Sequence, residues 1–269
     1  MQVTWLDNNT WLWEIAGQRI LVDPWLVGPL VFGGAGWLFR GVRSRPSPMP
    51  EAIDLILLSQ GLEDHAHPET LGALDKTIPV LASPTGARVA TDLGFHQVTA
   101  IAPGEVQTFA DITIKALPGA PMGPLRVENG YLLTNTAHQI TLFYEPHGFH
   151  PHSLRSHGPV DVVITPMQDL ALPLVGAILR GRQSARELAD WLQPQVMLPT
   201  AGAGESEYQG VLLPWLKVSG SVETVRAELA AQGNPAQVIE PQVGVAIELS
   251  LGKPAPAFGK PDWQPSPLQ

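Results

Sequence analysis

Short apolar stretches separated by turn residues dominate the first half of the chain. Residues 3–6, 10–15 and 19–22 each concentrate apolar side chains, and Gly17 marks a turn between the second and third stretches. Residues 53–59 form a continuous apolar run, which is typical of a strand that is covered on both faces. The pattern predicts strands in close succession, several of them paired as hairpins.

Helical spacing and end signals occur in four segments, residues 67–77, 84–95, 181–192 and 222–233. His67 precedes Pro68, and proline favours the first helical position, so the first helix is predicted to begin there. Ser184 has Glu187 three residues later, the spacing of a capping box, and is predicted to cap the third helix. Strands and helices therefore interleave along the chain.

Further strands are expected at residues 160–166, 195–199 and 243–250. Because many of the strands come in hairpin pairs, the order favours an α/β sandwich of mixed sheets over a purely parallel, doubly wound sheet. We expect one domain over residues 1–252. Residues 253–269 are rich in proline and are predicted to be a disordered tail.

Composition narrows the classes of partner. The chain has 269 residues, 44% of them hydrophobic, and a formal net charge of −9, which argues against a nucleic-acid partner. It has no cysteine, so any transition metal would depend on His, Asp and Glu side chains. No secretory signal and no long apolar span are visible, which favours a cytoplasmic protein.

The stretch from Trp25 to Arg45 is apolar, rich in glycine and aromatic residues, and contains Arg40 and Arg43 near its end. It is interpreted either as a loop folded over the core or as a segment that contacts a lipid surface or lines a groove for a lipid-like small molecule. In the lipid interpretation the arginines would meet anionic headgroups, which makes the protein a peripheral membrane protein.

Titratable side chains gather after two of the apolar runs. Asp64, His65 and His67 follow the run at residues 53–59, while Glu145 ends a further hairpin-like pair of predicted strands and His147 follows it. Such groups can hold a metal ion, but they are equally consistent with a polar network, a helix cap at His67 and a polar surface loop at residues 145–157.

A family resemblance covers the chain from Val3 to about Leu249. The motifs "WLDNNTWLWEIAGQRILVDPWLVG", "DLILLSQGLEDHAH", "PGEVQTFADITIKALPG", "TLFYEPHG" and "VDVVITP" resemble, in this order, the metallo-β-lactamase-fold hydrolases. The branch that includes ascorbate-lactonase-like and N-acylphosphatidylethanolamine-phospholipase-like enzymes is the most similar. The resemblance implies an αββα sandwich of two mixed β-sheets flanked by helices, with a metal site at one edge.

The metal motif departs from the family pattern His-x-His-x-Asp-His. Aligned on Asp64 and His65, this chain has Gln60 and Leu62 in place of the first two histidines. The loop after "ALPG" has no histidine, and Thr200 stands near the place of the last one. Glu145 replaces the family's bridging aspartate, and Asp23 matches an acid that would orient ligands from the second shell. An ordinary dinuclear hydrolase is therefore excluded.

The side chains that remain could hold one divalent ion (zinc, manganese or iron) or no metal. The candidate ligands are Asp64, His65, His67, Glu145 and His147, with Gln60 and Asp23 behind them, and Asp64 could instead act as a general base. A substrate is expected to meet Arg126, Glu128 and Asn129, unless Asn129 and Gly130 simply form a hairpin turn.

Two functions stay open at this point. The first is a metal-dependent hydrolase of an ester, lactone, amide or phosphodiester, acting on a lipid-like substrate. The second is a non-catalytic protein that binds a ligand, a membrane or an assembly partner on a hydrolase scaffold.

Overall fold

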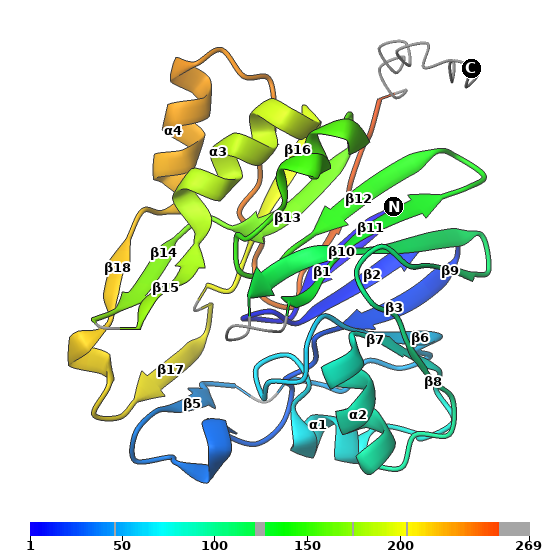
Figure 1. Cartoon of the computed structure of the whole chain (residues 1–269), viewed down its shortest axis with the longest axis vertical. Helices are drawn as coiled ribbons and strands as arrows, with labels where there is room; N and C mark the ends of the chain where they lie inside the picture. Colours follow the sequence, from blue (N-terminus) through cyan, green and yellow to red (C-terminus); the bar gives the residue numbers. More distant parts are fainter. Residues whose placement is uncertain (46, 122–126, 174, 203, 253–269) are drawn as a thin grey trace, which may run out of the picture.

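The computed structural model describes residues 1–45, 47–121, 127–173, 175–202 and 204–252 (Figure 1). Arg126 and the proline-rich tail at 253–269 lie outside the described residues. Two large sheets face one another, and helices cover their outer faces.

The first sheet has the strand order β20-β1-β2-β3-β6-β7-β8. Strands β1 to β3 form an antiparallel meander, and β3, β6, β7 and β8 then run parallel. The strands are β1 (Gln2–Trp5), β2 (Trp11–Ile15), β3 (Gln18–Val22), β6 (Leu55–Leu58), β7 (Val80–Ala82), β8 (Val98–Ala100) and β20 (Ala246–Glu248).

The second sheet repeats this plan with the order β19-β16-β13-β12-β11-β10-β9. Strands β9 to β12 are antiparallel, and β12, β13, β16 and β19 are parallel. They are β9 (Val106–Phe109), β10 (Ile112–Pro121), β11 (Val127–Asn135), β12 (Ile140–Tyr144), β13 (Val162–Pro166), β16 (Val196–Thr200) and β19 (Gln237–Val238).

Three separate apolar clusters define the layers. The central cluster lies between the sheets and includes Trp11, Trp13 and Ile164. A second cluster joins the first sheet to α1 (Pro68–Ala73) and α2 (Pro84–Asp92), and a third joins the second sheet to α3 (Gly181–Leu192) and α4 (Val222–Ala231). Because each sheet is apolar on both faces, each needs a helical layer outside it. The predicted αββα sandwich is confirmed.

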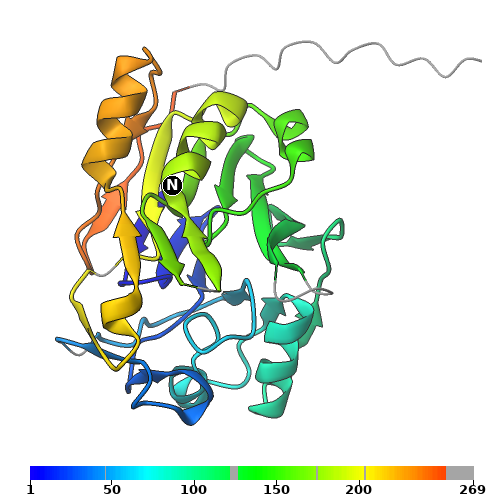
Figure 2. The ribbon, with the colours of Figure 1, turned by 60° about the vertical axis from the view of Figure 1, so that its left-hand side comes forward.

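Two small three-stranded sheets extend from one end of the sandwich (Figure 2). One has the order β17-β5-β4 and the other β15-β14-β18. Their strands are β4 (Leu30–Val31), β5 (Arg40–Arg43), β14 (Asp169–Leu172), β15 (Gly176–Arg180), β17 (Ser206–Gln209) and β18 (Lys217–Ser219), with short 3-10 turns at η1 (Phe32–Gly34), η2 (His152–His157) and η3 (Leu213–Trp215).

Two local predictions are wrong. Ser184 is not a helix cap, because α3 begins at Gly181 and the buried Ser184 hydroxyl instead lies 3.1 Å from Nδ1 of His150. Asn129 and Gly130 are not a hairpin turn but lie inside β11, where they pair with Pro118 and Leu117. In both cases contacts with distant segments outweigh a short-range sequence signal.

Buried polar contacts tie the two large sheets together beneath the end that carries the small sheets. The hydroxyl of Tyr144, on β12, donates to Oδ2 of Asp23 at 2.7 Å, just after β3. The hydroxyl of Tyr131 donates to the carbonyl of Leu58 at 2.7 Å, and Nε1 of Trp11 donates to Oγ1 of Thr200 at 3.0 Å. The register between the sheets is therefore fixed by hydrogen bonds as well as by packing.

Replacing Tyr144 by Phe should lower the free energy of unfolding by about 2 kcal/mol, because it removes a donor to a buried carboxylate. Urea denaturation measures the change. Tyr208→Phe is the matched control: its hydroxyl accepts only a 3.3 Å contact from Asn8, so we expect a loss of less than about 1 kcal/mol. Equal losses in the two variants would contradict the proposed role of the Tyr144–Asp23 contact.

Candidate metal centre

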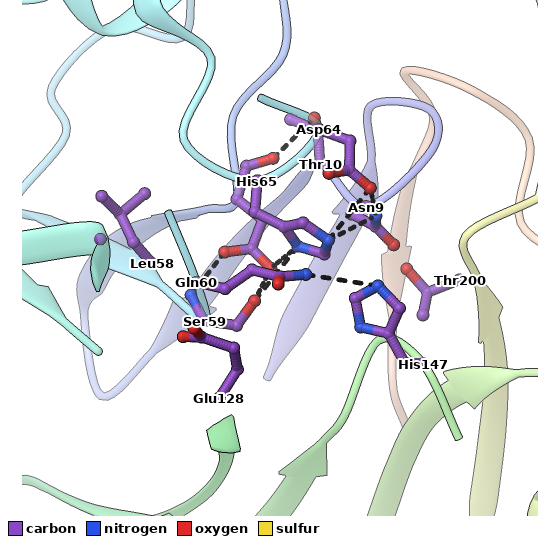
Figure 3. A network of polar contacts seen from close by, with 12 residues as sticks. Asn9, Thr10, Leu58, Ser59, Gln60, Asp64, His65, Glu128, His147 and Thr200 are labelled. Atoms are coloured by element: carbon purple, nitrogen blue, oxygen red, sulfur yellow. Dashed lines mark hydrogen bonds and ion pairs between the residues drawn. The ribbon is translucent and has the colours of Figure 1, made fainter. Parts of the chain in front are cut away.

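The candidate residues meet where parallel strands of both sheets end. Asp23 directly follows β3, Ser59 follows β6, and Glu145 follows β12. The carboxyl ends of neighbouring parallel strands lie at one edge of a sheet, so the loops that follow them converge. Asp64 and His65 belong to the loop between β6 and α1, directly above this edge (Figure 3).

Asp23 is a fully buried carboxylate with four donors around it. It accepts from the backbone N–H of Ser59 at 2.7 Å, from the Ser59 hydroxyl at 2.5 Å and from the Tyr144 hydroxyl at 2.7 Å. Its Oδ2 also lies 2.8 Å from Nδ1 of His65. This contact fixes the ring of His65 and leaves its Nε2 as the nitrogen directed to the site.

Nε2 of His65 lies 3.1 Å from Oδ2 of Asp64 and 3.3 Å from Nδ2 of Asn9. Burial lowers the pKa of His65, but Asp64 and Asp23 outweigh it and raise that pKa to about 10. Burial likewise raises the pKa of Asp64, and the charge and hydrogen bond of His65 reverse this and hold the pKa below its usual range. The two groups therefore form an ion pair at neutral pH when no metal is bound.

His147 approaches from the second sheet, two residues after Glu145. Its ring centroid lies 5.0 Å from that of His65, and its Nε2 lies 3.3 Å from Nε2 of Gln60 (Figure 3). Gly148 makes this turn possible: it has φ +78°, and a Cβ there would lie 2.5 Å from the carbonyl oxygen of Arg180. Burial, together with the charge of His65, lowers the pKa of His147 to about 3, so the ring is neutral.

Asp64, His65 and His147 fit a single divalent ion. Each offers one ligand atom, and these atoms lie within 4.8 Å of one another. One carboxylate and two imidazoles make three protein ligands, the number that catalytic zinc sites use together with an open fourth position. Three oxygens near this point are buried and have no hydrogen-bond partner among the described residues: Oδ1 of Asp64, Oδ1 of Asn9 and Oε1 of Gln60. Unpartnered oxygens of this kind are what a cation would satisfy.

Two other predicted ligands, His67 and Glu145, make contacts within the fold. Nδ1 of His67 accepts from the backbone N–H of Thr70 at 3.3 Å, and its Nε2 lies 3.2 Å from the carbonyl of Pro29. The contacts of His67 are thus those of a helix cap, which was the alternative interpretation. Glu145 does not belong to the group of three. Its Oε2 accepts from the backbone N–H groups of His147 and Phe149 at 3.2 and 2.7 Å, while its Oε1 is buried and has no hydrogen-bond partner among the described residues.

The predicted substrate residues are also engaged within the fold. Glu128 accepts from the hydroxyl of Thr85 at 2.8 Å, and Nδ2 of Asn129 donates to the carbonyl of Ile101 at 2.8 Å. Both residues are buried and neither lines the cavity described below. The sequence interpretation missed Asn9, which follows two residues with positive φ, Asp7 and Asn8, in the loop between β1 and β2.

A cavity of about 690 Å³ opens above the candidate metal centre. Its polar lining includes Asn9, Asp64 and His147 of the site, together with Asn8, Gln168, Asp169 and Tyr208. The rest is mostly apolar and comes from residues 30–39 and the two small sheets: Leu30, Phe32, Ala35, Leu38, Phe39, Leu170, Leu172, Ile178, Leu179, Leu212, Leu213, Leu216 and Val218. A concave apolar site with a few convergent polar groups is the usual form of a small-molecule site.

The fold and this site can now be compared with known proteins. The model of the β-lactamase superfamily domain matches residues 2–201, so the chain belongs to the metallo-β-lactamase-fold superfamily. This match confirms the resemblance at the level of the superfamily; assignment to one branch stays a prediction. A comparison with curated protein sequences finds no match.

Solved structures share the fold at low sequence identity. An isothiocyanate hydrolase from Delia radicum gut bacteria has a TM-score of 0.70 and 16% identity, over 93% of this chain and 99% of its own. A possible metal-dependent hydrolase from Veillonella parvula gives the same four values. CmlA, a diiron β-hydroxylase from Streptomyces venezuelae, has a TM-score of 0.62 and 19% identity, over 92% of this chain and 54% of its own. The fold therefore does not fix the reaction.

Glu145 generates a pH-dependent prediction. Burial raises its pKa from the usual value near 4.5 to about 8, so the folded protein holds a proton that the unfolded chain releases. This contribution to stability is present in full below about pH 4.5 and is lost as the pH rises through about 8. The Glu145→Gln variant cannot lose this proton. Between these limits, the free energy of unfolding of the variant minus that of the wild type should therefore increase by about 1 kcal/mol for each pH unit.

Thermal or urea unfolding of both proteins at a series of pH values measures this difference. Subtracting the two curves removes the contribution of His65, whose raised pKa also makes stability fall with rising pH. A difference that does not vary between pH 5 and about 8 would mean that Glu145 is ionised in the folded protein.

Proposed function

We propose that the protein is a metal-dependent hydrolase that uses a single divalent ion and acts on a small apolar substrate. The observation that supports this most directly is that Asp64 and His147 line an apolar cavity of about 690 Å³ while also forming, with His65, a three-ligand group. A ligand group alone could be structural, and an apolar cavity alone could be a binding site. Together they support a Lewis acid that a substrate in the cavity could reach.

Asp64, His65 and His147 would hold the ion through one carboxylate oxygen and two ring nitrogens. A divalent ion there would lower the pKa of water and polarise a carbonyl or phosphoryl oxygen. In its absence Nε2 of His65 carries a proton, because the pKa of this residue is about 10. Metal and proton therefore compete for the same nitrogen, and metal affinity should increase with pH.

A second ion has no comparable place among the described residues. Gln60 and Leu62 occupy the positions of two family histidines, and Thr200 stands near the third. The hydroxyl of Thr200 accepts from Nε1 of Trp11 at 3.0 Å and donates to the carbonyl of Asn8 at 3.2 Å. Internal hydrogen bonds thus use both a lone pair and the proton of the Thr200 hydroxyl in place of a second ion, which favours one-metal chemistry.

Residues of the chain would orient the substrate and the proton transfers. When one oxygen of Asp64 ligates the ion, its other oxygen could accept a hydrogen bond from the nucleophilic water and orient it. Nδ2 of Asn9 lies 3.4 Å from Oδ2 of Asp64 and could donate to a developing oxyanion in the same cavity. The apolar walls would exclude bulk water and strengthen these contacts.

Metal analysis tests the proposal directly. Tag-free protein loaded separately with zinc, manganese and iron should bind close to one equivalent of at least one metal. His147→Ala and Asp64→Asn should lower the affinity by at least about a hundredfold, and Asp23→Asn by about ten- to a hundredfold, because Asp23 acts through His65. His67→Asn is the matched control: asparagine also caps helices, so metal binding should not change.

A wild-type stoichiometry near zero with all three metals would remove the hydrolase proposal and leave the binding protein on a hydrolase scaffold. An equal loss of metal in His67→Asn and His147→Ala would contradict the ligand assignment.

Substrate preference follows from the cavity walls. With aryl esters of increasing acyl length, kcat/KM should rise by up to about fourfold per methylene until the cavity is filled, since each buried methylene contributes about 0.8 kcal/mol. Leu170→Trp, in the wall, should abolish this gain for long chains and spare the shortest ester. Val245→Trp, which is exposed and does not line the cavity, is the control. Hydrolysis that does not depend on chain length would contradict an apolar substrate.

A further inference from the structure

We propose that the face around the mouth of the apolar cavity docks on an anionic lipid surface. This face, here called the docking rim, consists of Trp37, Arg40, Val211, Trp215, Lys217 and Val218. The docking does not depend on the proposed hydrolysis and can be tested in the absence of any substrate.

The docking rim comes from two segments that are far apart in the sequence. Strand β5, which follows Trp37, pairs with β17, and the backbone N–H of Val211 then donates to the carbonyl of Trp37 at 3.3 Å. Leu212 continues this pairing with Leu38 at 3.2 Å. Both segments extend beyond the sandwich on the side of the small sheets (Figures 1 and 2).

Large apolar side chains of the rim are exposed to an unusual degree. Trp37 is 72% exposed, Trp215 63%, Val218 61% and Val211 56%. Val218 also lines the cavity, and so do neighbours of the rim residues in sequence, including Leu38, Phe39, Leu213 and Leu216. The apolar surface of the rim is thus continuous with the apolar walls of the cavity, so a molecule dissolved in lipid could pass between them without crossing water.

Charge favours an anionic partner. Residues 27–50 and 208–222 contain Arg40, Arg43, Arg45 and Lys217 but no Asp or Glu, although the whole chain has a net charge of −9. Acidic residues do flank these segments: Arg45 lies 3.7 Å from Glu205, and Glu63 accepts from the backbone N–H of Gly33, so Arg40 and Lys217 carry the positive charge of the rim. Arg43 is used inside the fold, where its guanidinium donates to the carbonyls of Trp25 and Leu6 at 2.9 and 2.7 Å. Arg40 and Lys217 are exposed and lie three and two residues from the exposed tryptophans.

Indole rings beside basic side chains are the combination that binds the interface of an anionic bilayer. The rings enter the headgroup region, and each Lys or Arg near the surface strengthens the attraction. No helix of the described residues is long and apolar enough to cross a bilayer, so the contact would be peripheral. The rim is narrower than the segment from Trp25 to Arg45 that the sequence suggested: Trp25 is fully buried, and Phe39 stacks on Tyr208 at 5.4 Å.

Co-sedimentation with vesicles tests this proposal. The full chain should sediment with vesicles of phosphatidylcholine mixed with phosphatidylglycerol, and much less with phosphatidylcholine alone. The double variant Trp37→Ser, Trp215→Ser should reduce the partition coefficient by at least about tenfold. Arg40→Gln and Lys217→Gln should each reduce it by about fivefold, only on the anionic vesicles, and the effect should diminish at high salt.

Matched controls lie away from the rim. Val106→Ser and Val245→Ser remove exposed apolar side chains, and Arg88→Gln removes an exposed positive charge on α2; all three should bind like the wild type. Thermal unfolding of each variant checks that the fold is intact.

Failure of the wild type to sediment with anionic vesicles, or equal binding by rim and control variants, would overturn the proposal. So would a wild-type dimer that the tryptophan variant dissociates without any vesicle binding, because the rim would then be a contact between two copies.

Discussion

The buried carboxylate of Asp23 is the interaction on which the rest of the site depends. A charged group without solvent is costly unless donors surround it, and Asp23 has four: two from Ser59, one from Tyr144 and one from His65. Ser59 follows a strand of the first sheet, and Tyr144 lies on a strand of the second. One carboxylate therefore joins the two layers and orients the imidazole that faces the cavity.

The position of Asp23 has a cost that its contacts must offset. Its φ is +43°, a left-handed conformation that non-glycine residues adopt rarely, at the point where β3 ends. Such strain, about 1 kcal/mol or more, persists only when other contacts stabilise the strained conformation. The four hydrogen bonds of Asp23 provide this stabilisation. They also hold His65 against Asp64 with the geometry needed for either an ion pair or shared ligation of a metal.

The site combines an inherited scaffold with a changed set of ligands. The family resemblance implies a metal site at this edge of the sandwich. This chain has Asp64 and His65 there, while Gln60, Leu62 and Thr200 stand at other positions of the metal motif. His147 reaches the same point from the second sheet, after a turn that Gly148 permits. The small sheets add apolar walls, so the chemistry proposed here is that of one ion in an apolar cavity rather than two ions in an open groove.

The sequence by itself determined the layers. Continuous apolar runs such as residues 53–59 require cover on both faces, and hairpin pairs interleaved with helices favour mixed sheets, so an α/β sandwich of mixed sheets could be predicted from local patterns. The αββα order of the layers, and a shared edge for Asp64, His65 and His147, followed only from the family resemblance. Asn9 and Trp215 could not be predicted, since the importance of each arises from neighbours that are distant in sequence.

Only the tertiary structure decided which of the candidate ligands lie close enough together to bind one metal ion. His67 and Glu145 are close in sequence to His65 and His147, yet neither belongs to the group of three. Nδ1 of His67 and Oε2 of Glu145 accept from the backbone of Thr70 and of Phe149. A local pattern specifies which face of a strand or helix is buried, because that depends on periodicity. The direction of a side chain within a loop depends on contacts across the fold, and those form only when both sheets are assembled.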